Sequence, residues 1–234
     1  MREPWFNRNL GISIALILLG LIVFFVAGYS AITESLLFRY DAPVENFMYQ
    51  LDRSTPQLLK YVAVVVDMLG NYGTDAIAFI LLVLFIRRRE WRKAGLVFFG
   101  LPVSGLVWMA VVYLVDRPRP EVVYLLGTDF LLPSFPSGHV WTVLSFYGVL
   151  LYMYWSQIDT PLKRTLLVAL YVLFVLFTGF VRMFHRGHYF TDVLGGIGGG
   201  LAWMVLAILL VEAYAHREIR KPTAKTSGYS VRDS

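Results

Sequence analysis

The chain has 234 residues, of which 57% are hydrophobic and 16% charged, and it contains no cysteine. This composition excludes an ordinary soluble domain, a disulfide framework and a thiolate metal site. The net charge of +5 does not indicate nucleic-acid binding, because the Lys and Arg residues form loop-sized blocks and do not alternate with aromatic residues on one face.

Apolar runs long enough to cross a bilayer recur along the chain and predict an all-α integral membrane bundle of six transmembrane helices. The first run has too long an apolar core for a signal peptide, and no small-residue cleavage site follows it, so we interpret it as a retained span. The second run is the least regular, because Asp67, Asn71 and Asp75 fall at its start. The predicted spans are Leu10–Ala31, Met68–Arg88, Ala94–Val115, Gly138–Trp155, Arg164–Phe184 and Phe190–Tyr214.

The first loop after span one contains the segment DAPVENFMYQL, from Asp41 to Leu51. Asp41 is predicted to be a helix N-cap with Pro43 in the first turn. The apolar residues of this segment recur with helical spacing, which predicts an interfacial extracytoplasmic helix. A helix that packs on the spans and a helix that guides lipid remain equal alternatives.

Residues 1–214 are predicted to form a single six-span membrane domain, and residues 215–234 a polar, disordered cytoplasmic tail. Most Lys and Arg residues lie in the two termini, in the segment RRREWRK and at Lys163 and Arg164. With six spans these segments share one side, so the positive-inside rule places both termini in the cytoplasm of a multi-pass cell membrane protein. Glycines are frequent early in the last span and favour close helix packing over substrate contact: Gly195, Gly196, Gly198, Gly199 and Gly200.

Three polar segments lie at span ends on the opposite, extracytoplasmic side. They are DRPRP after span three, PSFPSGH before span four, and RMFHRGHYFTD between spans five and six. Together they carry four arginines and three of the four histidines of the chain. A single arginine or histidine at a span end is commonly a lipid-headgroup contact or a packing residue, so the prediction of a site rests on the conjunction of the three segments.

These residue types suit phosphoryl transfer without a metal or other cofactor. Arginine recognises phosphate oxygens through paired hydrogen bonds. Ser137 and Gly138 stand at the start of a helix, where backbone N–H groups and the helix dipole favour an anion. His188 and Asp192 have i, i+4 spacing, which permits the carboxylate to hold one imidazole nitrogen while the other faces a ligand. A metal site is disfavoured by the arginines and by the lack of a carboxylate cluster.

With these motifs in this order, the sequence resembles the type-2 phosphatidate phosphatase superfamily, the integral-membrane lipid phosphate phosphatases. The signature of that family is K-x6-RP, then PSGH, then SR-x5-H-x3-D. This chain has Arg119-Pro120, then Pro136-Ser137-Gly138-His139, then Arg182, His188 and Asp192 at the same gaps. The resemblance covers nearly the whole chain, and the third motif is the most specific part of it.

Two positions depart from the family pattern. Val112 stands where the family has its first lysine, and Val181 stands where a serine precedes the third-motif arginine. We hypothesise that Arg117 or Arg186 supplies the missing positive charge as an auxiliary phosphate-binding residue. His185 has no family counterpart and is either a further auxiliary residue or part of the rim.

The resemblance implies a role for each matching residue. His188 would attack phosphorus and form a phosphohistidine intermediate, and Asp192 would orient it and stabilise its positive charge. His139 would protonate the leaving lipid oxygen and then activate the hydrolytic water. The residues implied to bind the phosphate oxygens are Arg119, Arg182, Ser137 and Gly138.

The implied function is a membrane lipid phosphate or diphosphate phosphatase acting at the extracytoplasmic face, on substrates such as undecaprenyl diphosphate, phosphatidylglycerophosphate or phosphatidate. The expected partners are the phosphorylated lipid and the bilayer, with no nucleic acid and no metal or cofactor. Two alternatives remain open at this point. One is a lipid phosphotransferase that uses the same intermediate, and the other is a non-catalytic lipid-binding or transport protein.

Overall fold

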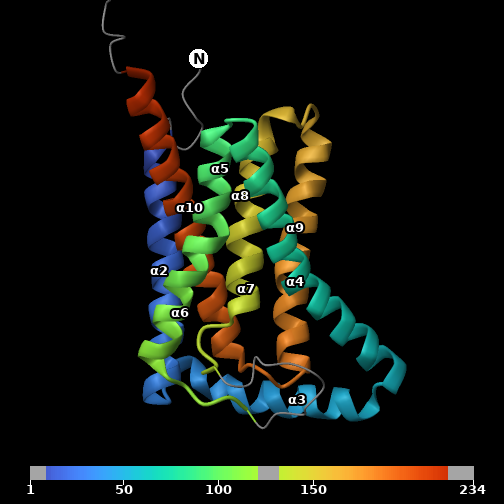
Figure 1. Cartoon of the computed structure of the whole chain (residues 1–234). Helices are drawn as coiled ribbons and strands as arrows, with labels where there is room; N and C mark the ends of the chain where they lie inside the picture. Colours follow the sequence, from blue (N-terminus) through green and yellow to red (C-terminus); the bar gives the residue numbers. More distant parts are fainter. Residues whose placement is uncertain (1–8, 121–131, 221–234) are drawn as a thin grey trace, which may run out of the picture.

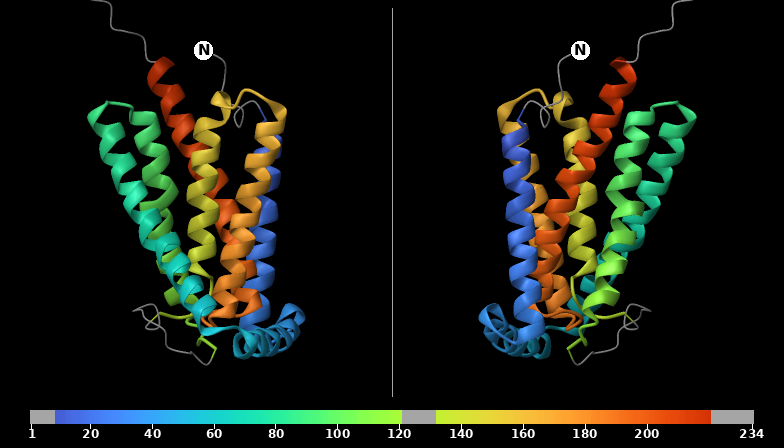
Figure 2. Two further views of the ribbon diagram at one scale, coloured as in Figure 1. Left: turned by 90° about the vertical axis from the view of Figure 1, so that its right-hand side faces the viewer. Right: turned by 90° about the vertical axis from the view of Figure 1, so that its left-hand side faces the viewer.

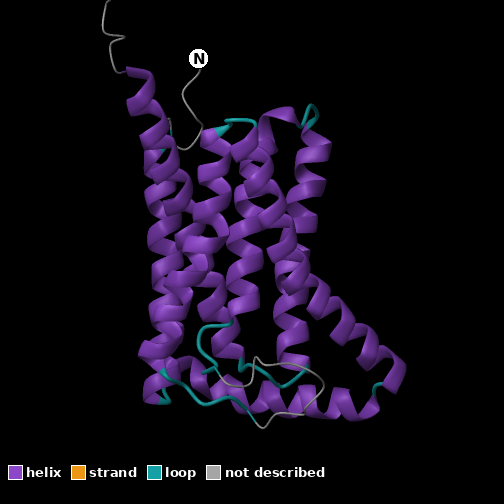
Figure 3. Cartoon of the chain, in the orientation of Figure 1, coloured by secondary structure: helices purple, strands orange, loops and turns teal. Residues whose placement is uncertain are grey.

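The computed structural model describes residues 9–120 and 132–220, and within these ranges every regular element is helical (Figure 3). The helices, in chain order, are α2 (Leu10–Thr33), η1 (Leu36–Tyr40), α3 (Asp41–Ser54), α4 (Gln57–Arg87), α5 (Trp91–Phe98), η2 (Phe99–Val103), α6 (Ser104–Val115), α7 (Gly138–Thr142), η4 (Val143–Tyr147), α8 (Gly148–Tyr154), η5 (Trp155–Gln157), α9 (Pro161–Phe184) and α10 (Phe190–Arg220).

Several of these elements join into continuous rods. The segments α5, η2 and α6 form one, with a π-helical turn at Pro102, whose ring nitrogen has no N–H to donate. The segments α7, η4 and α8 form another, again with a π-helical turn in the middle. The long helices lie side by side, and α3 crosses one end of the bundle (Figures 1 and 2).

Four helical stretches are long and apolar enough to cross a membrane, which confirms an all-helical membrane protein. They are Leu10–Thr33, Trp91–Val115, Pro161–Phe184 and Phe190–His216. The predicted spans within them agree with the helices to within a few residues at most ends. Helix α10 runs on to Arg220 and so includes the first residues of the predicted tail. The rest of that tail, residues 221–234, and residues 1–8 lie outside the described residues.

Helix α4 differs most from its prediction, because it begins at Gln57 and not at Met68. The sequence predicts a span only from Met68 onwards, because Lys60 and Asp67 interrupt the apolar run before that residue. Pro56 occupies the N-cap, where the missing N–H costs no hydrogen bond, and good helix formers follow it. Asp67 therefore lies within a helix, on the side of the molecule that carries the polar segments.

The glycines of α10 allow the backbones of α2 and α10 to approach closely. A Cβ atom added at Gly198 would lie 2.5 Å from the backbone nitrogen of Phe24, and one added at Gly20 would lie 2.7 Å from the carbonyl oxygen of Gly198. At Gly199 the neighbour is the ring of Trp141. These distances support the packing role expected for small residues between membrane helices.

We expect Gly198→Ala to lower the melting temperature of the purified protein. The added methyl collides with backbone, which has little freedom to move, and overpacking of this kind costs about 1–3 kcal/mol. Gly105→Ala in α6 is the matched control, because a Cβ there has nothing within 4 Å. Its melting temperature should stay the same or rise slightly, since alanine is the better helix former. Equal melting temperatures for the two variants would contradict the close approach of α2 and α10.

At the end of the bundle opposite α3, an ion pair with a buried carboxylate joins the helices. Glu212 on α10 is 1% exposed and pairs with Arg92 on α5, and it also accepts a hydrogen bond from the Tyr152 hydroxyl on α8 at 2.9 Å. A buried carboxylate needs such partners, because its desolvation is otherwise too costly. This cluster therefore fixes three helices together at that end.

Candidate active site

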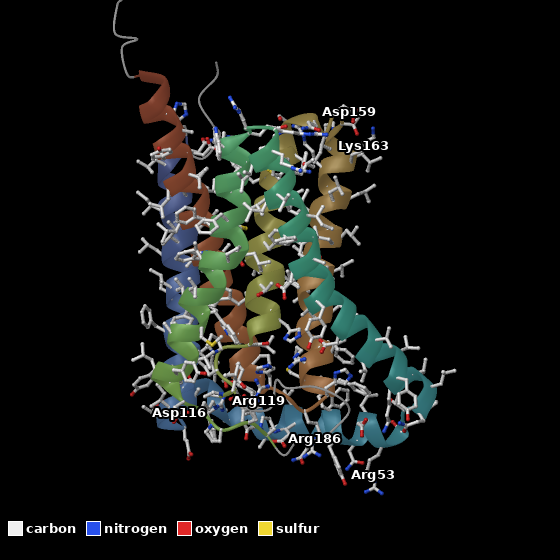
Figure 4. The ribbon with its side chains drawn as sticks, viewed as in Figure 1. Arg53, Asp116, Arg119, Asp159, Lys163 and Arg186 are labelled. Carbon is white, nitrogen blue, oxygen red and sulfur yellow. The ribbon has the colours of Figure 1, made fainter. Side chains whose placement is uncertain are left out.

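The three polar segments come together at the end of the bundle crossed by α3. Figure 4 shows Arg119 and Arg186 at this end and Lys163 and Asp159 at the other. Backbone hydrogen bonds join the segments directly. Ser134 N–H donates to the Arg117 carbonyl at 2.7 Å, and Ser137 N–H donates to the Asp192 carbonyl at 3.0 Å.

The PSGH segment starts helix α7 inside a crowded environment. A Cβ at Gly138 would lie 2.5 Å from the Trp108 ring, so the close contact with that ring requires glycine. The Trp108 indole N–H donates to the Pro136 carbonyl at 2.9 Å and fixes the approach to the helix. The Ser137 hydroxyl is buried and has no hydrogen-bond partner among the described residues. It could therefore donate a hydrogen bond to a ligand oxygen.

The imidazole of His188 is held by a backbone carbonyl. Its Nδ1 lies 2.8 Å from the Ser134 carbonyl oxygen and 3.6 Å from the nearer Asp192 carboxylate oxygen. Since a carbonyl only accepts, Nδ1 carries the proton, and the lone pair of Nε2 faces the Arg119 guanidinium at 3.3 Å. The residue spacing had predicted Asp192 as the hydrogen-bond acceptor. The Ser134 carbonyl takes that position instead, and Asp192 acts on the ring from slightly further away.

The pKa of His188 is lowered to about 4, mainly because the imidazole is buried. The nearby Arg182 and Arg119 act in the same direction, and Asp192 acts in the opposite direction. His188 is therefore neutral at physiological pH, as a nucleophile must be.

Asp192 fixes the turn that carries His188. It is the third residue of α10, and its carboxylate accepts a hydrogen bond from the Tyr189 backbone N–H at 2.9 Å. This is one half of a capping box, in which an acidic side chain reaches back to the residue before the helix. The carboxylate is fully buried and also accepts a hydrogen bond from the Arg117 guanidinium.

Arg117 lies in a buried network and not at the surface of a cavity. Its guanidinium donates to Asp41 at 2.7 Å and to the Thr191 hydroxyl at 2.8 Å, and it stacks 4.2 Å from the centre of the Tyr189 ring. Burial disfavours its charge, but the Asp192 and Asp41 carboxylates raise its pKa above the ordinary value. A direct contact with phosphate was expected of Arg117, and its donors are directed to these partners instead.

Asp41 completes this network from α3. The sequence predicted that it caps the helix, but Tyr40 occupies the N-cap and Asp41 is the first helical residue. Its carboxylate accepts from the Thr191 backbone N–H at 2.9 Å and from the Thr191 hydroxyl at 2.7 Å. Asp41 thereby joins α3 to the start of α10, next to the turn that carries His188.

Arg119 is fixed by backbone carbonyls. Its Nε donates to Leu132 at 2.7 Å and its Nη1 donates to Gly187 at 2.9 Å. These bonds hold the guanidinium next to the Nε2 atom of His188, where a phosphate oxygen would have to bind during an attack by that nitrogen.

Arg182 and His139 share a partner that the sequence did not identify as functional. An Asp67 carboxylate oxygen on α4 lies 2.5 Å from the Arg182 Nη1 atom and 3.8 Å from the His139 Nε2 atom. The sequence showed Asp67 only as an irregularity at the start of a span. Burying an acidic side chain in a membrane helix is energetically unfavourable, so its presence there could have indicated a specific partner for Asp67.

His185 and Arg186 lie towards α3. Arg186 is 3.5 Å from a Glu45 carboxylate oxygen and 5.1 Å from the centre of the Tyr49 ring. His185 follows the last residue of α9, and its burial lowers its pKa. Val112, at the position of the missing lysine, is completely buried in the bundle.

A cavity of about 170 Å³ lies between these segments, large enough for a phosphate group. Two arginines, two histidines and the glycine of PSGH contribute to its wall, which makes it a cationic pocket with a neutral imidazole on one side. Its lining residues are Trp108, Arg119, Leu132, Gly138, His139, Thr142, Arg182 and His188.

The family model of the PAP2 superfamily matches residues 93–215, which include all three polar segments and more than half of the chain. The chain belongs to the PAP2 superfamily. This finding confirms the resemblance inferred from the motifs, in spite of Val112 and Val181.

The chain is also similar to two known proteins, one in sequence and one in structure. The chain is 28% identical over 142 residues to the undecaprenyl-diphosphatase BcrC of Bacillus subtilis (strain 168), a match that covers 57% of this chain and 66% of that protein, just under two thirds of its length. The structure is similar to the crystal structure of a transmembrane PAP2 type phosphatidylglycerolphosphate phosphatase from Bacillus subtilis. The TM-score is 0.65 at 20% identity, covering 90% of this chain and 98% of that one, which supports the shared fold.

Proposed function

We propose that this PAP2 protein is a membrane phosphatase that hydrolyses the phosphate or diphosphate group of a lipid. The observation that carries the proposal is the cationic cavity in which His188, His139, Arg119 and Arg182 meet at one end of an apolar helical bundle. Membership of the PAP2 superfamily and the activities named for the two relatives support a phosphorylated lipid as substrate.

In the proposed mechanism, the Nε2 lone pair of His188 forms a bond to phosphorus while the bond from phosphorus to the lipid oxygen breaks. His139 gives its proton to that leaving oxygen. In the second step His139 takes a proton from water, the resulting hydroxide attacks phosphorus, and the N–P bond breaks to restore neutral His188. Arg119, Arg182, Ser137 and the Gly138 N–H would bind the phosphate oxygens throughout.

We assign six transmembrane helices, adding α4 and the rod Gly138–Tyr154 to the four apolar stretches, with α3 at the membrane interface. The exposure of the apolar residues on α3 supports an interfacial position, because Phe47 is 60% exposed while the neighbouring Met48 is buried against the bundle. Basic residues at the end opposite the cavity support a cytoplasmic location for that end and an extracytoplasmic active site. Examples are Arg92, Lys93, Lys163 and Arg164.

An apolar groove between α8 and α9 supports a substrate with a hydrocarbon chain. Its volume is about 760 Å³, and its wall includes Phe174 and Phe177. These two residues also line a small cavity of about 20 Å³ that reaches His139 and Asp67. The leaving lipid oxygen would therefore approach from the side of His139.

We expect the purified protein to release phosphate from at least one member of a panel of lipid monophosphates and diphosphates, without added metal. The panel should contain a polyprenyl diphosphate, a phosphatidylglycerophosphate and a phosphatidate, with His188→Gln as the blank. Vanadate should inhibit the reaction, because it forms a five-coordinate adduct with an active-site nucleophile. A protein that binds these lipids without releasing phosphate would be a binding or transport protein. Transfer of the phosphate to an added alcohol, in preference to water, would indicate a phosphotransferase.

A further inference from the structure

Asp67 is a charged group near the cavity to which the proposed mechanism gives no role. It lies on α4, and its side chain is 13% exposed. One carboxylate oxygen contacts both Arg182, at 2.5 Å, and His139, at 3.8 Å. Arg182 also faces the cavity, so a phosphate bound there would compete with Asp67 for the same guanidinium.

The imidazole of His139 stands in a cationic environment. Arg119 after α6, Arg182 on α9 and His188 between α9 and α10 line the same cavity as His139. A general acid must carry its proton when the leaving group departs, and positive groups on the same wall oppose a further positive charge. Asp67 is the carboxylate within 4 Å of its Nε2 atom among the residues that the structure describes.

We propose that Asp67 is the positioning residue of the general acid His139, an inference that rests on the proposed phosphatase function. In the resting protein the carboxylate pairs with Arg182. When the phosphate group takes over Arg182, the nearest cationic partner left to Asp67 is the His139 imidazolium. Asp67 then stabilises that imidazolium and orients its N–H towards the leaving oxygen. The proton passes from His139 to the lipid oxygen, and Asp67 itself neither gains nor loses a proton.

The location of Asp67 agrees with this role. It lines the small cavity together with His139, and that cavity meets the apolar groove at Phe174 and Phe177. Asp67 and His139 therefore share the side from which a lipid chain would enter, while His188 faces the main cavity next to Arg119. A carboxylate on the leaving-group side serves the acid and not the nucleophile.

The test compares two substrates with the same hydrocarbon chain. One is an alkyl phosphate, whose leaving oxygen needs a proton. The other is the phosphate monoester of a nitrophenol whose ring carries that alkyl chain. Its leaving phenolate oxygen is stable without a proton. Values of kcat/KM are measured, because they report the steps up to loss of the leaving group. We expect Asp67→Asn to lower kcat/KM for the alkyl phosphate by roughly tenfold or more, and to change it little for the nitrophenyl phosphate.

Two further variants complete the experiment. Asp67→Glu keeps the carboxylate and should recover part of the activity on the alkyl phosphate. Asp75→Asn removes an exposed carboxylate two turns further along α4 and should leave both substrates unaffected. Melting curves of all variants report whether they are folded.

The other outcomes are distinct. Equal losses on both substrates would mean that Asp67 only supports the fold. A lower KM for both substrates would mean that Asp67 merely blocks Arg182. Either result overturns this inference while the wild-type protein stays active. Absence of phosphate release from the wild-type protein would overturn the proposed function as well.

Discussion

Replacement of His188 by Gln is expected to lower kcat/KM for the lipid substrate by about 10⁴-fold or more, the effect typical of removing a nucleophile. Glutamine retains a polar group near the Ser134 carbonyl but offers no nitrogen lone pair to phosphorus. The structure supports the role of nucleophile, because the Ser134 carbonyl can only accept a hydrogen bond from Nδ1, which leaves the lone pair on Nε2, and because His188 lines the cavity. The measurement is phosphate release under saturating and subsaturating substrate.

The phosphohistidine itself provides a second measurement. Wild-type protein mixed with radiolabelled substrate and quenched in alkaline denaturant should retain label on the protein, because a phosphorus–nitrogen bond survives base. The label should be absent from His188→Gln. His216→Gln, near the far end of α10, is the matched control and should keep both label and turnover. Normal turnover of His188→Gln would refute the mechanism.

Replacement of Arg117 by Gln is expected to reduce both stability and turnover. The side chain is 7% exposed, and its loss leaves the Asp192 and Asp41 carboxylates buried without their cation. Breaking a buried ion pair in this way costs about 3–5 kcal/mol. The turn with His188 loses its support, and a nucleophile displaced by about 1 Å reacts roughly 100-fold more slowly. Thermal melting and kcat measure the two effects.

The value of KM separates this explanation from a direct phosphate contact. Arg117 does not line the cavity, so we expect KM and vanadate inhibition to change much less than kcat. A large rise in KM with unchanged stability would instead indicate that Arg117 binds phosphate. The double variant Arg117→Gln, Asp41→Asn should recover part of the stability, because it also removes one unpaired carboxylate. Arg186→Gln is the matched control at the same end of the bundle, since that arginine pairs with Glu45 at a longer 3.5 Å.

The elements with local signals were predictable from the sequence. Long apolar runs predict membrane helices, because a bilayer requires about 20 apolar residues in a row. The i, i+4 spacing of His188 and Asp192 predicted that both lie on one helix face, but α10 begins at Phe190, so Asp192 is helical and His188 lies in the turn before the helix. The predicted start of α4 was wrong, because a charged residue that interrupts an apolar run is typical of a loop as long as its charged partner is unknown. Asp67 has that partner on α9, far away in the sequence.

The exact contacts of the arginines had no local signal. Arg117 and Arg119 are separated by one residue, yet one is directed to buried carboxylates and the other to carbonyls beside the cavity. The sequence could not distinguish them, because their partners come from α3, from the start of α10 and from the loops.

By itself, then, the sequence determined the membrane helices, the three polar segments and the family they represent. These features depend on periodicity, composition and short fixed gaps along the chain. Only the tertiary structure decided which donor meets which acceptor: the Ser134 carbonyl at His188, Asp41 at Arg117 and Asp67 between Arg182 and His139. A buried polar or charged group takes the partner that folding brings close to it, and in each of these contacts that partner is more than fifty residues away along the chain.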